Sequence, residues 1–155
     1  MEIKITLFIT MLLYAAVISQ SFFYMLAMSN VSKTMNATAY IQTRQLLDKN
    51  LKTSLPAVYY ATLLASIALT AFCVTNPSGI LFLASIISLL ALVADIVLTL
   101  KGNVPLNKII NSWNECEYPA DWDRYRAKWL AVYNIRQVVN LAGFIVLLAG
   151  MVFGM

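Results

Sequence analysis

The sequence of 155 residues contains no histidine. Histidine is a common metal ligand and the usual general base near neutral pH, so its absence argues against a histidine-held haem and against a catalytic triad built on histidine. Cysteine is nearly as scarce, because only Cys73 and Cys116 occur, and the two form no CxxC motif. Thiol redox chemistry therefore has no support in the sequence.

Charged residues are also few. They make up 12% of the chain, whereas 61% of the residues are hydrophobic, and a soluble domain carries about 25% charged residues. The composition therefore predicts a single integral membrane domain over residues 1–155. The net charge of +4 is not gathered into a basic stripe, and no zinc-ligand spacing occurs, so we expect no nucleic-acid partner.

Long apolar runs are what the chain has in abundance. Only four polar side chains, of Thr10, Ser19, Gln20 and Ser21, interrupt residues 7–27, and about 20 residues of helix are enough to cross a bilayer. Similar runs predict transmembrane helices at about residues 5–28, 56–75, 79–100 and 127–153. Short connections make consecutive helices antiparallel neighbours, so the expected fold is all-α: a four-transmembrane-helix up-down bundle.

The connection between the first two spans is long. Residues 30–54 carry apolar residues at helical spacing, which predicts a short amphipathic helix that lies near the surface or extends the first span. Ser54-Leu-Pro56 has the composition of a helix start, because serine caps well and proline fits a first turn. The Asn-Pro-Ser-Gly motif at 76–79 predicts a tight turn between the second and third spans.

A second long connection precedes the last helix. Lys101-Gly102 predicts the end of the third span, and a loop is expected over residues 103–120. Asp121 is a candidate cap for a last helix over residues 122–153. The expected bundle therefore has a long loop or amphipathic segment between helices 1 and 2, and another between helices 3 and 4.

The basic residues predict how the chain is oriented. Both termini and the turn at 76–79 share one side of the bundle, where Lys4 is the basic residue. The opposite side, which we call the loop side, carries nine basic residues: Lys33, Arg44, Lys49, Lys52, Lys101, Lys108, Arg124, Arg126 and Lys128. Cytoplasmic loops are enriched in lysine and arginine. In a plasma membrane or bacterial inner membrane we therefore expect the loop side in the cytoplasm and the termini outside.

The same topology separates the two cysteines. Cys73 is expected on the terminal side and Cys116 on the loop side, with a hydrocarbon core of about 30 Å between them. A disulfide requires Cα atoms within about 7 Å, so the two cannot pair within one chain.

Two charged residues are expected inside the membrane. Asp95 lies six residues before Lys101 in the third span, and Arg136 lies seven residues after Trp129 in the last helix, which runs in the opposite direction. The two side chains therefore reach a similar depth. A charge in hydrocarbon needs a partner, and Asp95 is the single acidic residue within the predicted spans. We predict an Asp95–Arg136 ion pair.

Other polar and aromatic residues fall at the same level. Trp129, Tyr133, Arg136 and Asn140 are spaced by four, three and four residues, which places them on one face of the last helix. Gln20 and Tyr59 lie near the loop-side ends of the first two spans. We therefore expect all four helices to bring polar groups to one layer, open to the loop side.

This layer has a simpler interpretation. The ion pair, with Gln20 and Asn140 completing its hydrogen bonds, can fix helix register without any chemistry. Trp113 and Trp122 can belong to an aromatic belt at the membrane surface. Glycines at 143, 150 and 154 of the last helix indicate close helix contacts, either within the bundle or between protomers of an oligomer.

The residues from Asn103 to Arg136 also carry a resemblance. Asn103-Val-Pro-Leu-Asn107, then Trp113, Pro119-Ala-Asp-Trp122, Arg126, Trp129 and Arg136 form a pattern that resembles the anthrone oxygenase-like family. These are small four-helix membrane proteins, largely described as a domain of unknown function. The four-span plan extends the resemblance over the rest of the chain.

The resemblance implies oxidation of an anthrone to an anthraquinone by molecular oxygen, with no metal or flavin cofactor. Arg136 would then hold a phenolate, and Asn103 and Asn107 would donate hydrogen bonds, although asparagines beside Pro105 can equally satisfy backbone groups in a turn. Trp122 and Trp129 would stack on a flat ring. The sequence departs from the family at Tyr133, where relatives often have His or Asn.

These residues support two functional hypotheses. The first is a membrane-embedded oxygenase-like or binding protein for a flat, apolar phenolic or quinone-type molecule or lipid. Its candidate catalytic residues are Asp95, Arg136 and Tyr133, and its candidate substrate-binding residues are Gln20, Tyr59, Asn103, Asn107, Trp113, Trp122, Trp129 and Asn140. The second is a non-catalytic structural or accessory protein, such as a homo-oligomer or a subunit of a membrane complex, whose buried polar layer fixes helix packing.

Overall fold

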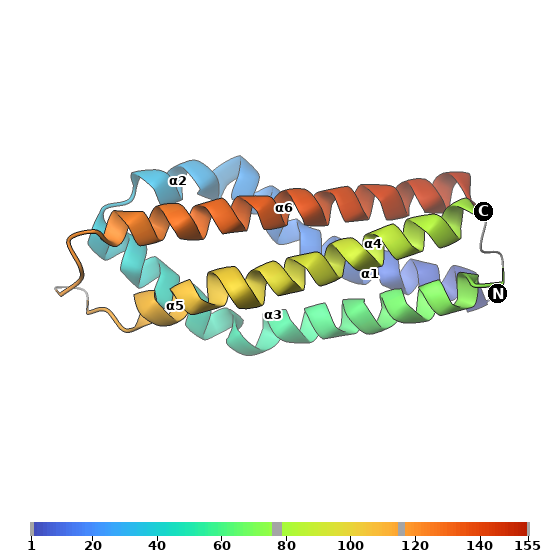
Figure 1. Cartoon of the computed structure of the whole chain (residues 1–155), viewed down its shortest axis with the longest axis horizontal. Coiled ribbons are helices and arrows are strands. Elements are labelled where there is room, and N and C mark those ends of the chain that lie inside the picture. The colour runs from blue at the N-terminus through green and yellow to red at the C-terminus, as the bar shows by residue number, and fades with distance from the viewer. Residues whose placement is uncertain (1, 76–78, 115–116, 155) are drawn as a thin grey trace.

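The computed structural model describes residues 2–75, 79–114 and 117–154, and every regular element in these ranges is helical. The long helical rods, four in the described ranges, lie side by side, and both ends of the chain lie at the same end of the molecule (Figure 1). Two expected features, the centre of the turn at 76–79 and Cys116, fall outside the described residues.

Each rod in the described ranges is long and apolar enough to cross a membrane, as expected from the composition. The four rods are Glu2–Thr34, Ala37–Cys73, Ile80–Asn111 and Trp122–Phe153. Their outward faces carry large apolar side chains, including Phe8, Leu64, Leu90 and Val138. An apolar outer surface of this kind suits a lipid environment, since water offers it no favourable contact.

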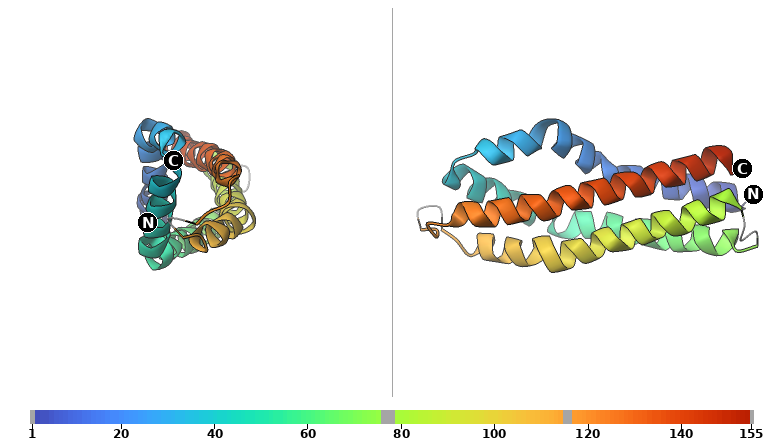
Figure 2. Two further views of the ribbon diagram at one scale, coloured as in Figure 1. Left: turned by 90° about the vertical axis from the view of Figure 1, so that its left-hand side faces the viewer. Right: turned by 45° about the horizontal axis from the view of Figure 1, so that its top comes forward.

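The first rod contains one irregular turn. It consists of α1 (Glu2–Phe23), the π-helical segment η1 (Tyr24–Met28) and α2 (Ser29–Thr34). In η1 the N–H of Ser29 donates to the carbonyl of Tyr24, five residues earlier. Figure 2 shows the rod bending near this segment, so that α2 stands away from α6.

The second rod begins earlier than expected. Asn36 caps α3 (Ala37–Cys73), because its side-chain oxygen accepts a hydrogen bond from the N–H of Ala39 at 2.9 Å. The expected helix start at Ser54-Leu-Pro56 is wrong: Ser54 donates to the carbonyl of Asn50, and Pro56 lies inside the helix. Most of the amphipathic segment is thus the first half of this rod. Packing keeps the helix continuous although proline removes one backbone donor.

The third rod ends later than expected. After α4 (Ile80–Leu98), a second π-helical segment, η2 (Thr99–Asn103), leads directly into α5 (Val104–Asn111). The expected stop at Lys101-Gly102 is therefore wrong, and residues 104–111 are helical. Gly102 has a different purpose: a Cβ there would lie 2.6 Å from Cγ1 of Val132, so glycine permits close approach of α6.

The last helix has the expected bounds, since α6 runs over Trp122–Phe153. Asp121 precedes it, but its side chain makes no capping hydrogen bond. Two of the glycines on α6 face its neighbours within the bundle. A Cβ at Gly143 would meet the Tyr14 hydroxyl and the Ala91 methyl, and a Cβ at Gly150 would meet Ala84.

The close contact at Gly150 leads to a prediction about stability. Gly150→Val should lower the free energy of unfolding by about 1–3 kcal/mol, since the added methyl groups must push α6 away from α4. Thermal unfolding in detergent measures this change. Ala142→Val on the exposed side of α6 is the matched control. Equal melting temperatures for the two variants would contradict the close contact.

Candidate functional site

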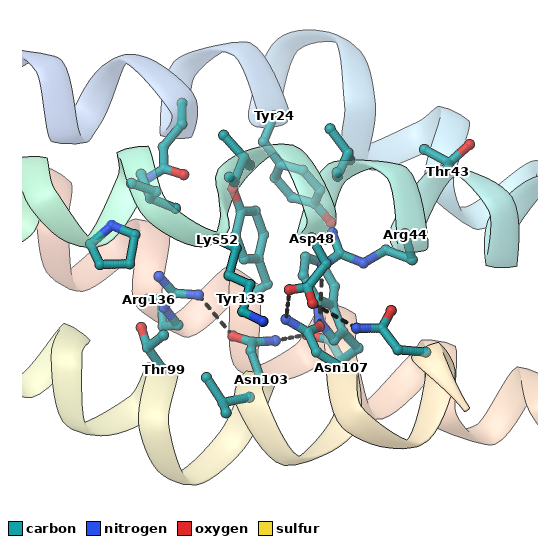
Figure 3. A pocket seen from close by; sticks show the side chains of 18 of the residues that line it. Tyr24, Thr43, Arg44, Asp48, Lys52, Thr99, Asn103, Asn107, Tyr133 and Arg136 are labelled. Atoms are coloured by element: carbon teal, nitrogen blue, oxygen red, sulfur yellow. Dashed lines mark hydrogen bonds between the residues drawn. The ribbon is translucent and has the colours of Figure 1, made fainter. Parts of the chain in front are cut away.

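A cavity of about 980 Å³ opens between the rods (Figure 3), toward the end of the molecule opposite the termini (Figure 1). All four rods contribute to its lining. Most of the wall is apolar and includes Phe23, Met28, Leu47, Leu51, Leu55, Ile96 and Leu100. Polar and charged side chains also line the cavity, and several of them belong to two clusters, one around Arg136 and one around Asn107.

Two π-helical segments and a proline inside a regular α-helix border this cavity. Residues of η1, residues of η2 and Pro56 of α3 all contribute to its lining. A π-turn inserts an extra residue into a helix and displaces the helical residues after it, and such turns are frequent at functional sites. The space between the rods therefore coincides with the places where the helices are irregular.

The first cluster is centred on Arg136. Its Nε donates to Oδ1 of Asp95 at 2.7 Å, and its Nη1 donates to Oδ1 of Asn103 at 2.9 Å. Arg136 is 5% exposed and Asp95 is fully buried. The ion pair predicted from the sequence is therefore present, and its guanidinium faces the bundle interior.

The Tyr59 hydroxyl connects this cluster to the other rods. It accepts long hydrogen bonds from Gln20 Nε2 at 3.3 Å, Arg136 Nη2 at 3.4 Å and Asn140 Nδ2 at 3.5 Å. Gln20 and Asn140 thus reach the ion pair through Tyr59, whereas direct hydrogen bonds were expected. The expected polar layer does draw on all four rods.

The second cluster is centred on Asn107 and lies nearer the loop-side end. Oδ1 of Asn107 accepts from Trp129 Nε1 at 2.7 Å and from Arg44 Nη2 at 3.1 Å, while its Nδ2 donates to Asp48 Oδ1 at 2.9 Å. Asn111 donates to the other oxygen of Asp48 at 2.6 Å. The side-chain amide of Asn107, on α5, therefore forms hydrogen bonds to both α3 and α6.

Asn103 and Asn107 therefore form hydrogen bonds between helices. Their alternative interpretation, as residues that satisfy backbone groups in a turn, did not predict these contacts. Asn103 also donates to the backbone carbonyl of Trp129 at 3.0 Å.

Polar residues recur at every fourth position of this rod: Asp95, Thr99, Asn103, Asn107 and Asn111. In a regular α-helix, side chains spaced by four residues would drift around the helix axis by about 160° over these 16 residues. The extra residue of the π-turn in η2 reduces this drift by about 100°. This spacing of four residues therefore indicates a helix that continues past Lys101-Gly102, where the third span was expected to end.

Trp129 does not offer a free ring face to a ligand. The Arg44 guanidinium lies 3.9 Å from the centre of its indole ring, and Tyr133 stacks on it at 4.7 Å and 20°. A guanidinium and a parallel ring at these distances cannot share one face, so both faces are covered. The stacking on a flat ligand expected for Trp129 is not available in this conformation. Tyr133 in turn packs edge-on against Tyr24 at 4.5 Å.

Two other tryptophans of the motif lie outside the cavity. Trp113 packs against Tyr125 at 5.2 Å, and Trp122 packs against Tyr40 at 6.1 Å. The Arg126 guanidinium lies 4.6 Å from the Trp122 ring, and its Nη1 donates to the carbonyl of Met35 at 2.7 Å. Trp122 and Arg126 thus hold the start of α6 against Tyr40 and Met35, whereas Trp113 packs on α6 from the segment that follows α5. Neither tryptophan lines the cavity. Asn140 does not line the cavity either, although its Nδ2 donates to the Tyr59 hydroxyl, which does.

The sequence reasoning also missed side chains from the first half of α3. Arg44, Asp48 and Lys52 line the cavity, and their spacing of four residues places them on one helix face. Among the described residues, Asp48 is the carboxylate that lines the cavity, whereas Asp95 lies behind Arg136. From the sequence, residues 30–54 were expected to form a surface segment or an extension of the first span, so Arg44, Asp48 and Lys52 were not considered as site residues.

No group of three or more histidine, cysteine, aspartate or glutamate side chains in the described ranges could hold a metal ion. Comparisons with protein-family models, curated proteins and solved structures found no match for this chain. The functional assignment therefore depends on the cavity and its two polar clusters.

The buried ion pair leads to a second prediction. Arg136→Leu should destabilise the protein by about 3–5 kcal/mol, because it leaves the Asp95 carboxylate buried without its cation. The double variant Asp95→Leu/Arg136→Leu should recover most of this loss, since no unpaired charge remains. Thermal unfolding in detergent compares the two. A single variant as stable as the parent protein would show that the carboxylate is not held by this arginine.

Proposed function

We propose that this protein binds a flat, apolar molecule of phenolic or quinone type inside the membrane. The supporting observation is the cavity of about 980 Å³, whose apolar walls surround two clusters of hydrogen-bonded polar groups. Small-molecule sites have volumes of about 300–1,000 Å³ and combine apolar lining with a few placed polar groups. The cavity has the size and the composition of such a site.

Recognition of a ligand oxygen would fall to the Arg136 cluster. A guanidinium has five N–H donors, and the bonds to Asp95, Asn103 and Tyr59 use three of them. The remaining donors can bind a phenolate or a quinone carbonyl. Because the cluster is already held by Asp95 and Asn103, binding requires little reorganisation, which favours stabilisation of developing negative charge.

Oxygenase chemistry is a narrower form of this proposal. Conversion of an anthrone CH2 to C=O by O2 releases one water and begins with removal of a proton. Asp48 is better placed for this step than Asp95, because it lines the cavity. However, both Asp48 oxygens already accept amide hydrogen bonds, from Asn107 and Asn111, so an oxygen that takes up a proton must first give up one of these contacts. Binding is therefore the better supported part of the proposal.

The structural or accessory role is the alternative. It is favoured by the number of contacts that the Arg136 cluster makes between rods, and it requires no ligand. The double variant Asp95→Leu/Arg136→Leu separates the two ideas. A stable double variant that no longer binds the ligand would contradict a purely structural role, whereas unchanged binding would contradict recognition by Arg136.

The main test fills the cavity. Leu51→Trp places a larger side chain in the lining of the cavity and should abolish binding of a neutral anthraquinone, measured by equilibrium dialysis of the purified protein. Leu64→Trp is the matched control on the same helix, since Leu64 is 68% exposed on the outer surface. Equal binding by both variants would contradict the proposed site. Oxygen uptake with an anthrone, tested in parallel, distinguishes an oxygenase from a binder.

We also propose an up-and-down arrangement in the membrane, with the cavity end in the cytoplasm. The support is the excess of basic residues at that end. Single cysteines introduced at Lys4 and Lys128 of a cysteine-free variant should react with an impermeant thiol reagent from opposite sides. In intact cells, the residue-4 site should be labelled and the residue-128 site protected. The reverse pattern would contradict this orientation.

A further inference from the structure

The cavity shares a wall with a second hollow on the outside of the molecule. This outer hollow of about 510 Å³ lies between α3 and α5 and is lined by Gln45, Asp48, Lys49, Lys52, Asn111 and Trp113. Three of these residues, Asp48, Lys52 and Asn111, also line the cavity. The boundary between the two spaces therefore consists of side chains.

These boundary side chains are held by few contacts. Asn111 donates to Asp48 at 2.6 Å, and Asp48 is held in turn by Asn107. Lys52 is exposed and forms no ion pair within the described ranges. Figure 3 shows Lys52 extending from α3 over the cavity.

The loop-side part of the cavity is positively charged. Arg44, Lys52 and Lys108 line it, and Asp48 is the carboxylate present there, which leaves an excess of two positive charges. Arg136 adds nothing to this excess, because Asp95 neutralises it. In the described part of the chain Lys108, like Lys52, has no ion-pair partner. Positive charge in a partly enclosed, apolar-walled space attracts anions more strongly than it would in open water.

We propose that the α3–α5 boundary formed by Asp48, Lys52 and Asn111 is the entrance to the cavity, and that the ligand carries an anionic group. The inference rests on the proposed function and adds the chemical class of its ligand. The carboxylate or phosphate group of the ligand pairs with Lys52 and Lys108 beside the entrance. The flat apolar body extends inward along the leucine-lined wall toward Arg136.

Ordinary membrane-surface lysines offer a competing explanation, since they bind anionic lipid head groups without any cavity. The chain contains controls for this possibility. Lys49 lines the outer hollow but not the cavity, and Lys101 lines neither. A general surface attraction would depend on all four lysines, whereas the proposed site depends on Lys52 and Lys108.

The experiment compares two probes that differ in charge. Quenching of tryptophan fluorescence in uncharged detergent measures the affinities of anthraquinone-2-carboxylate and of neutral 2-(hydroxymethyl)anthraquinone. The carboxylate should bind more tightly, and its advantage should fall as salt is added. Lys52→Gln or Lys108→Gln should weaken carboxylate binding about fivefold and leave the neutral probe unchanged. Lys49→Gln and Lys101→Gln should behave as the parent protein.

The results distinguish the anionic-ligand inference from the proposed function. Equal binding of both probes, with no effect of Lys52→Gln, would overturn the anionic-ligand inference and leave the proposed function intact. Failure of both probes to bind would count against both. Displacement of the carboxylate by phosphatidic acid but not by phosphatidylcholine would identify a lipid phosphate as the anion, and lack of displacement would favour a free carboxylated ring.

A rate measurement tests the entrance. Asn111→Phe places a larger side chain at the boundary and should slow association of both probes several-fold in stopped-flow quenching. Asn114→Phe is the matched control, because Asn114 is exposed and lines neither space. Equal association rates for the two variants would show that ligands enter by another route.

Discussion

The buried contact between Arg136 and Asp95 is the interaction on which the arrangement of the bundle depends. A guanidinium in an apolar interior is tolerated only when a nearby opposite charge compensates its own. Asp95 on α4 supplies the charge, and Asn103 and Tyr59 accept from the remaining nitrogens. These contacts determine the register of α6 against α4 and hold α3 beside them. An apolar interface between the same helices would tolerate sliding, whereas a directional ion pair does not.

Irregular helix geometry is what makes room beside this contact. Four straight helices packed along their whole length would leave no space for a cavity of about 980 Å³. The π-turn in the first rod bends α2 away from α6, and the π-turn in the third rod turns Asn103 and Asn107 toward the interior. The polar clusters then restore contacts between the diverging rods. The half of the bundle near the termini has no such turn in the described ranges, and it is filled by Tyr14, Leu69, Leu92 and Leu147.

Trp129 links the two polar clusters, although it is not the stacking platform that its position in the sequence indicated. Its carbonyl accepts from Asn103, and its indole N–H donates to Asn107. Both of its ring faces are covered, by Arg44 and by Tyr133. The residue is therefore part of a fixed wall, and any ligand meets apolar side chains and unused N–H donors rather than an open aromatic face. A fixed wall favours binding, because little has to be ordered when the ligand enters.

The sequence by itself determined the helical class, the four apolar rods, the bounds of the last helix and the Asp95–Arg136 pair. These depend on apolar length, helical period and the cost of an unpaired charge, which are local or nearly local properties. Tertiary structure alone decided that helices continue through Gly102 and Pro56, because packing against Val132 and the neighbouring rods outweighs the local preference of glycine and proline to end a helix. It also decided that Asp48 faces the cavity while Asp95 lies behind Arg136, and that Arg44 covers Trp129. Such contacts join residues far apart in the chain, and no local pattern encodes which of them meet.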